Sequence, residues 1–100
     1  MTNPRLEAFR KMVEKNPGNA LARFGLASEA MKDGDFALAV EQLTAYLAMY
    51  DDEGNGFQRL GEALTALGRV DDARAAYEQG IAAAERFGHP GMASELRERL

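Results

Sequence analysis

Residues 57–85, FQRLGEALTALGRVDDARAAYEQGIAAAE, carry the pattern that decides the fold. Small and large apolar residues recur there at spacings of three and four, the period of one helix face. Gly68 separates two such segments, which contain Leu60, Gly61 and Leu64 in the first and Ala73, Tyr77 and Ile81 in the second. The stretch therefore predicts two short helices joined by a turn, with small residues where the helices touch.

The same arrangement occurs 34 residues earlier, around a turn at Gly34. This pattern resembles the tetratricopeptide repeat (TPR), which has a period of about 34 residues. The positions that match its motif are Phe57, Leu60, Gly61, Gly68, Ala73 and Tyr77 in one unit and Leu26, Gly34, Phe36, Ala39 and Leu43 in the other. Four positions depart from it: Arg23 replaces the large aromatic residue, Tyr46 a small one, and Asp51 and Glu85 the closing proline.

The resemblance implies an all-α fold, in which antiparallel helix-turn-helix repeats stack as an α-α superhelix of about six helices. We expect one domain, residues 1–100, because a chain of this length holds a single core. Its predicted parts are an N-terminal half-unit helix (3–16), a first repeat (19–52), a second repeat (53–86) and a C-terminal capping helix (90–100).

Local signals add expectations for the helix ends and faces. Asn3, Asn19 and Asp35 are suitable N-caps, whereas Gly54 and Gly56 weaken a helix start, so we expect the first turn after residue 54 to fray. The predicted buried stripes at the two ends of the chain are Leu6, Phe9, Met12 and Val13 in the first helix and Met92, Leu96 and Leu100 in the last.

The composition limits the classes of function. The net charge is −4 and the charges are interspersed, which argues against a nucleic-acid partner. Cysteine is absent and no segment is apolar enough to span a bilayer, so we expect a cytoplasmic protein without a membrane partner. His89 has no nearby nucleophile, and the acidic residues 51–53 lack the spacing of a calcium loop. We therefore expect no enzymatic activity, no cofactor and no metal.

By resemblance to the family, the first helix of each repeat lines a concave groove that binds another protein or a peptide segment. The groove positions carried over to this chain are Leu21, Phe24, Ser28, Met31 and Lys32 from the first repeat and Asn55, Gln58, Arg59, Glu62 and Thr65 from the second. Leu21, Phe24 and Met31 form an apolar patch, while the second set consists of hydrogen-bonding groups. We expect a segment with one apolar anchor beside polar contacts, and Arg59 is best placed to pair with a carboxylate.

Two alternatives remain open. Phe24 could supply the core aromatic side chain that its neighbour Arg23 cannot, instead of facing a ligand. The module could also self-associate as a homodimer, with the apolar patch or an end helix meeting a second copy. A carboxylate clamp of the kind some family members use is incomplete here, because Phe24 and Ser28 occupy its places in the first repeat.

Overall fold

A computed structural model describes residues 3–100, and Met1 and Thr2 of the predicted domain lie outside the described residues. Residues 3–100 form six α-helices and contain no strand, which confirms the predicted all-helical fold. The helices are α1 (Pro4–Lys15), α2 (Ala20–Lys32), α3 (Phe36–Met49), α4 (Asn55–Ala66), α5 (Val70–Arg86) and α6 (Pro90–Arg97). These bounds lie within the predicted units.

The first three helices begin at the predicted caps. The side-chain oxygen of Asn3 accepts a hydrogen bond from the backbone N–H of Leu6 at 3.0 Å, and Asn19 does the same for Ala22. Asp35 caps α3 in the same way. Each bond satisfies an amide that has no partner inside the helix. Positive φ angles near 77° at three glycines then end α2, α4 and α5: Gly34, Gly68 and Gly88.

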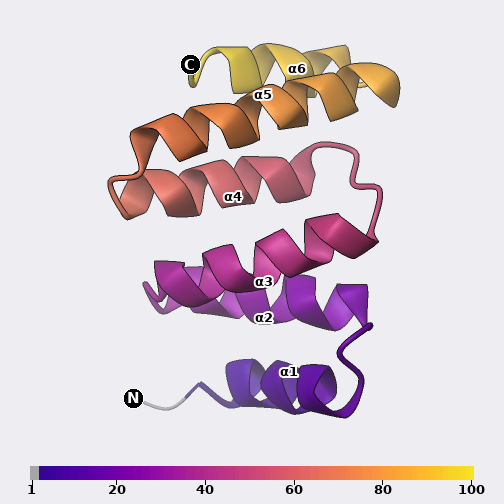
Figure 1. The fold of residues 1–100 in the computed structure, drawn as a ribbon, viewed down its shortest axis with the longest axis vertical. Helices are drawn as coiled ribbons and strands as arrows, with labels where there is room; N and C mark the ends of the chain where they lie inside the picture. Colours follow the sequence, from indigo (N-terminus) through magenta and orange to yellow (C-terminus); the bar gives the residue numbers. More distant parts are fainter. Residues whose placement is uncertain (1–2) are drawn as a thin grey trace.

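The helices stack in chain order along the long axis of the molecule, from α1 at one end to α6 at the other (Figure 1). Each helix packs on the next one along the chain. We call α2 with α3 the first helix pair and α4 with α5 the second helix pair. The helices α1 and α6 cover the two ends of this four-helix centre.

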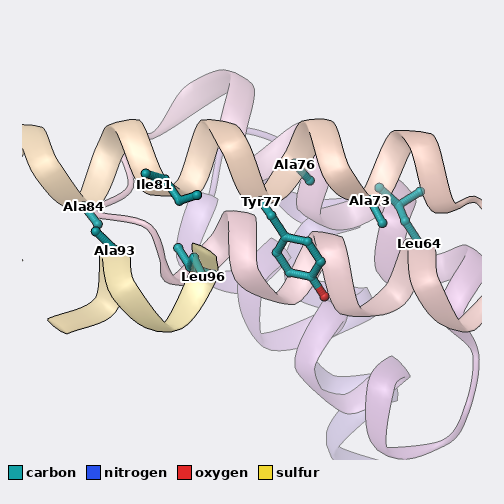
Figure 2. Close-up of a cluster of buried hydrophobic side chains, with 8 residues drawn as sticks. All are labelled: Leu64, Ala73, Ala76, Tyr77, Ile81, Ala84, Ala93 and Leu96. Atoms are coloured by element: carbon teal, nitrogen blue, oxygen red, sulfur yellow. The ribbon is translucent and has the colours of Figure 1, made fainter. Parts of the chain in front are cut away.

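The core consists of two connected clusters. The first lies among α1, α2 and α3 and contains Leu6, Leu26, Ala27, Ala30, Ala39 and Leu43, with Ala63 of α4. The second lies among α4, α5 and α6 and contains Leu64, Ala73, Ala76, Tyr77, Ile81, Ala84, Ala93 and Leu96 (Figure 2). Val40 and Leu60 pack against both clusters, so burial is continuous through the stack. The many alanines let the helix backbones approach one another closely.

Glycine permits a close contact between neighbouring helices in each half of the molecule. A Cβ atom at Gly61 in α4 would overlap the ring of Tyr77 in α5, and one at Gly25 in α2 would overlap the ring of Phe9 in α1. Tyr77 is 6% exposed, whereas Phe9 is partly buried. Both halves therefore contain a contact between a glycine and an aromatic ring, but the Phe9 ring has more room to move than the Tyr77 ring.

The predicted stripes of the end helices need correction. Leu96 is fully buried, as expected, but Leu100 is 45% exposed because α6 ends at Arg97 and Leu100 lies beyond it. Ala93, which the predicted stripe omitted, is buried beside Leu96. In α1, Leu6 is buried while Met12 is 45% exposed, since Met12 lies outside the first cluster.

The start of α4 also differs from its prediction. The expected frayed turn is instead capped by Asp52, a side chain that is only 5% exposed. Its Oδ1 accepts hydrogen bonds from the backbone N–H groups of Gly54 at 2.8 Å and Gly56 at 2.7 Å, and its Oδ2 accepts one from the Tyr46 hydroxyl at 2.6 Å. A Cβ atom at Gly56 would lie 2.8 Å from the Tyr46 ring, so the glycine that weakens the helix start also admits Tyr46.

Candidate functional site

The ten candidate residues occupy α2 and α4, the first helices of the two pairs. Leu21 is the most exposed large apolar side chain of the candidates, at 76%. Lys32, Asn55 and Thr65 are also exposed, and the other candidates, Phe24, Ser28, Met31, Gln58, Arg59 and Glu62, are partly buried. The predicted face therefore has an open apolar end at the start of α2.

Phe24 and Arg59 bring the two halves of the candidate set together. The Arg59 guanidinium lies over the Phe24 ring, with Cζ 5.5 Å from its centroid, a cation–π arrangement. The Phe24 ring also packs against Tyr46, centroid to centroid at 5.0 Å, and Tyr46 stacks on Tyr50 at 5.3 Å. Phe24 thus packs against the first cluster on one side and is covered by Arg59 on the other. The core role and the groove role suggested by the sequence each describe one of these sides.

Arg59 is the arginine without a polar partner among residues 3–100. All the others form a hydrogen bond or an ion pair there: Arg5, Arg10, Arg23, Arg69, Arg74, Arg86, Arg97 and Arg99. The Nε atom of Arg59 is buried and has no hydrogen-bond partner. This guanidinium is suited to donate hydrogen bonds to a carboxylate, which matches its planar arrangement of donors.

Glu62, one helical turn after Arg59, is already paired. Its Oε2 accepts a hydrogen bond from Arg99 beyond the end of α6 at 2.7 Å. The Arg99 guanidinium also lies over the Tyr77 ring at 5.9 Å. Hydrogen bonding to the Glu62 carboxylate is the largest influence on Arg99 and raises its pKa. The predicted ligand contact of Glu62 would therefore have to compete with an internal cation.

Three further candidates are engaged within the protein. The Ser28 hydroxyl donates to the Phe24 carbonyl at 3.0 Å, and the Thr65 hydroxyl donates to the Gly61 carbonyl at 2.8 Å. Lys32 forms an ion pair with Glu29 at 3.1 Å. By contrast, the side chains of Asn55 and Gln58 form no hydrogen bond within the described part of the chain. Free polar groups are therefore concentrated in the first half of α4.

The comparison with protein families decides the kind of repeat. The sequence profile of the family described as tetratricopeptide repeat matches residues 1–84. The chain belongs to the tetratricopeptide repeat family. A TPR repeat-containing protein of Pseudomonas aeruginosa (strain PAO1) is 35% identical over 91 residues, which cover 91% of this chain and 87% of that protein. TPR domains generally bind other proteins and are generally not enzymes, so membership indicates a protein-interaction module.

Arg99 is the residue near the TPR candidate face that sequence reasoning missed. The sequence predicts the last helix as a cap, and its predicted buried stripe of Met92, Leu96 and Leu100 does not include Arg99. The 34-residue period offered a signal, because Arg99 follows Thr65 by that distance and so occupies an equivalent position. A hollow of about 140 Å³ joins the two, lined by Thr65, Val70, Ala73, Arg74, Tyr77, Arg99 and Leu100.

Three further observations concern other site types in the described part of the chain. Residues 3–100 contain no group of three or more His, Asp or Glu side chains that could hold a metal ion. His89 lies at the start of α6 with Nε2 3.3 Å from Glu53 Oε1. No helix in this part of the chain has the length and apolar character needed to cross a membrane.

Proposed function

We propose that this chain binds a peptide segment of a partner protein on the face formed by α2 and α4, and that Arg59 pairs there with a carboxylate of the segment. The observation that carries the proposal is the unpartnered Arg59 guanidinium, whose buried Nε has no acceptor. A bound carboxylate would pair with this guanidinium through charge-assisted hydrogen bonds, which are about twice as strong as neutral ones.

The apolar contact of this segment would be made at Leu21. Leu21 is 76% exposed and lies one turn before Phe24, on the same side of α2. An aliphatic side chain of the segment would cover Leu21 and the accessible part of Phe24. An acidic residue of the same segment would pair with Arg59. The partner chemistry is therefore an acidic residue near an aliphatic one.

Asn55 and Gln58 would fix the orientation of the segment. Their amide side chains form no hydrogen bond within residues 3–100, and each offers both donors and acceptors to a peptide backbone. The helices that present these groups are held by the core, so binding needs little reordering and involves no chemical change.

The test uses labelled twelve-residue peptides with one Leu and one Asp at several separations, and matched peptides with Asn in place of Asp. We expect fluorescence anisotropy to detect binding of Asp peptides and about tenfold or greater weakening by Arg59→Gln, since a hydrogen bond to a charged group contributes about 1.5–3 kcal/mol. Arg69→Gln is the matched control, because Arg69 precedes α5 and is already paired with Asp72 in the first turn of that helix. This variant should leave the affinity unchanged.

Equal binding of the Asp and Asn peptides, or equal binding by Arg59→Gln, would refute the proposal. Light scattering over a wide concentration range examines the alternative of self-association. A dimer that dissociates in the Leu21→Asp variant would mean that a second copy occupies this face. That variant is suitable because Leu21 is exposed and absent from both core clusters.

A further inference from the structure

Glu62 of α4 forms an ion pair that the local sequence does not favour. Arg59 and Glu62 are three residues apart on α4, a spacing that places two side chains side by side on a helix surface. Opposite charges at this spacing ordinarily attract one another. Glu62 instead binds Arg99 at 2.7 Å, across 37 residues of sequence, and Arg59 has no polar partner within residues 3–100.

The position of Arg99 is fixed by the second cluster. Its guanidinium lies over the Tyr77 ring, and Tyr77 is buried between α5 and the close approach at Gly61. Figure 2 shows the Tyr77 ring reaching away from α5, with its oxygen at the far end. Leu96, which is fully buried, holds α6 against the same cluster. Arg99 is therefore presented to Glu62 from a well-packed support.

We propose that Arg99 is a positioning residue: by binding Glu62, it keeps the Arg59 guanidinium free of an internal carboxylate and available to the carboxylate of a bound segment. This inference rests on the proposed function of the α2 and α4 face. Arg99 also neutralises the one acidic side chain that lies one turn from Arg59 on α4, and so reduces repulsion of an incoming carboxylate. The last helix then contributes to recognition as well as covering the end of the core.

The first measurement needs no ligand. A crystal structure of the Arg99→Gln variant should show the Glu62 carboxylate turned toward Arg59, with an N–O distance of about 4 Å or less, the usual limit for an ion pair. Glu62 remaining apart from Arg59 in that structure would overturn the inference. This result does not depend on whether any peptide binds.

The second measurement uses the Leu and Asp probe peptide. Arg99→Gln should weaken its binding about two- to threefold, the scale of a helix-surface ion pair that must first be broken. Glu62→Gln added to Arg99→Gln should restore the original affinity, because no acidic competitor then remains beside Arg59. Failure of the second substitution to restore affinity would overturn the inference even if Arg99→Gln binds weakly.

The matched control is Arg97→Gln. Arg97 is the last residue of α6, two positions before Arg99, and forms an ion pair of the same length with Glu85, at 2.7 Å. It should leave the affinity unchanged, and a loss equal to that of Arg99→Gln would mean a general effect of α6. Arg99→Met, which keeps the aliphatic stem over Tyr77, replaces Arg99→Gln if thermal melts show that the latter unfolds. Absence of peptide binding by the natural chain refutes the proposed function, whereas the crystal structure separately decides the role of Arg99.

Discussion

The loops that precede α2 and α4 occupy equivalent places in the repeat but are closed differently. Before α2, Asn19 caps the helix with one hydrogen bond, to the N–H of Ala22. Before α4, Asp52 accepts three hydrogen bonds from a buried position. The difference follows from Tyr46, a large residue at a position where the repeat usually has a small one. Its hydroxyl requires a buried acceptor, and Asp52 supplies it.

The two helix pairs also differ in how their charges are satisfied. In the first pair, Arg23 donates to the side chain of the buried Gln42 at 3.0 Å and to the Pro17 carbonyl at 2.8 Å. In the second pair, Arg59 has no such partner within the described residues. Arg23, a departure from the motif, therefore contributes hydrogen bonds within the first pair. In the second pair, the charge of Arg59 stays available.

The largest effect is expected from breaking the loop before α4. Asp52→Ala removes the acceptor of three buried donors, and each unsatisfied donor costs about 1–3 kcal/mol, so we expect destabilisation of about 3 kcal/mol or more. Asn19→Ala should cost only about 1 kcal/mol, the usual cost of losing an N-cap. Urea unfolding followed by circular dichroism measures both values.

Asp52→Asn is the control for this comparison, because an amide oxygen can still accept from Gly54 and Gly56 while its NH₂ group faces the Tyr46 hydroxyl. It should be milder than Asp52→Ala. If the Asn19 and Asp52 alanine variants lose equal stability, the buried carboxylate is no more than an ordinary cap.

A smaller effect is expected at Phe24, where the two helix pairs meet. Phe24→Ala should cost about 2 kcal/mol, less than the 3–5 kcal/mol of a fully buried phenylalanine, because the side chain is partly buried. Leu21→Ala on the same face should leave stability nearly unchanged. A cost at Phe24 below about 0.5 kcal/mol would assign its ring to the ligand face alone.

Local signals allowed most of the fold to be predicted from the sequence. The caps Asn3, Asn19 and Asp35 and the left-handed glycines act within four residues of their partners, so they can be recognised without the tertiary structure. The 34-residue period then fixed which helices pair. These predictions depend on spacing alone, and spacing is visible in one sequence.

The contacts at the start of α4 and beside the candidate site depend on the tertiary structure instead. The Asp52 carboxylate meets the Tyr46 hydroxyl, and Arg99 meets Glu62, because packing directs those side chains to one place. Gly56 was interpreted as a weak helix start from its propensity, while its missing Cβ in fact admits the Tyr46 ring. A propensity describes one residue, whereas these roles belong to pairs of residues that are fixed only after folding.

The two glycine contacts allow a finer comparison of the two halves of the molecule. Gly61→Ala should destabilise by about 1–2 kcal/mol, because overlap with a buried ring costs about 1–3 kcal/mol and the helix gains up to about 1 kcal/mol from alanine. Gly25→Ala should cost less, since the Phe9 ring is partly exposed and can shift. Thermal melts of the two variants give the order, and a larger loss at Gly25 would contradict it.

The smallest effect concerns Glu29 in the first helix pair, whose side chain is only 6% exposed. Its hydrogen bond with Lys32 is the largest influence and lowers its pKa below the ordinary 4.5, with further help from Asn3 and Arg5 and against the opposing effect of burial. A carboxylate with a lowered pKa adds stability that is fully present above its unfolded-state pKa and is lost as the pH falls through the folded-state value.

The stability difference between the natural chain and Glu29→Gln should therefore be constant near neutral pH and shrink below about pH 4.5. Urea midpoints from about pH 7 to pH 3 measure it, with Glu78→Gln, an exposed residue of α5, as the control. A difference that stays constant down to pH 3 would show that ionisation of Glu29 does not stabilise the first helix pair.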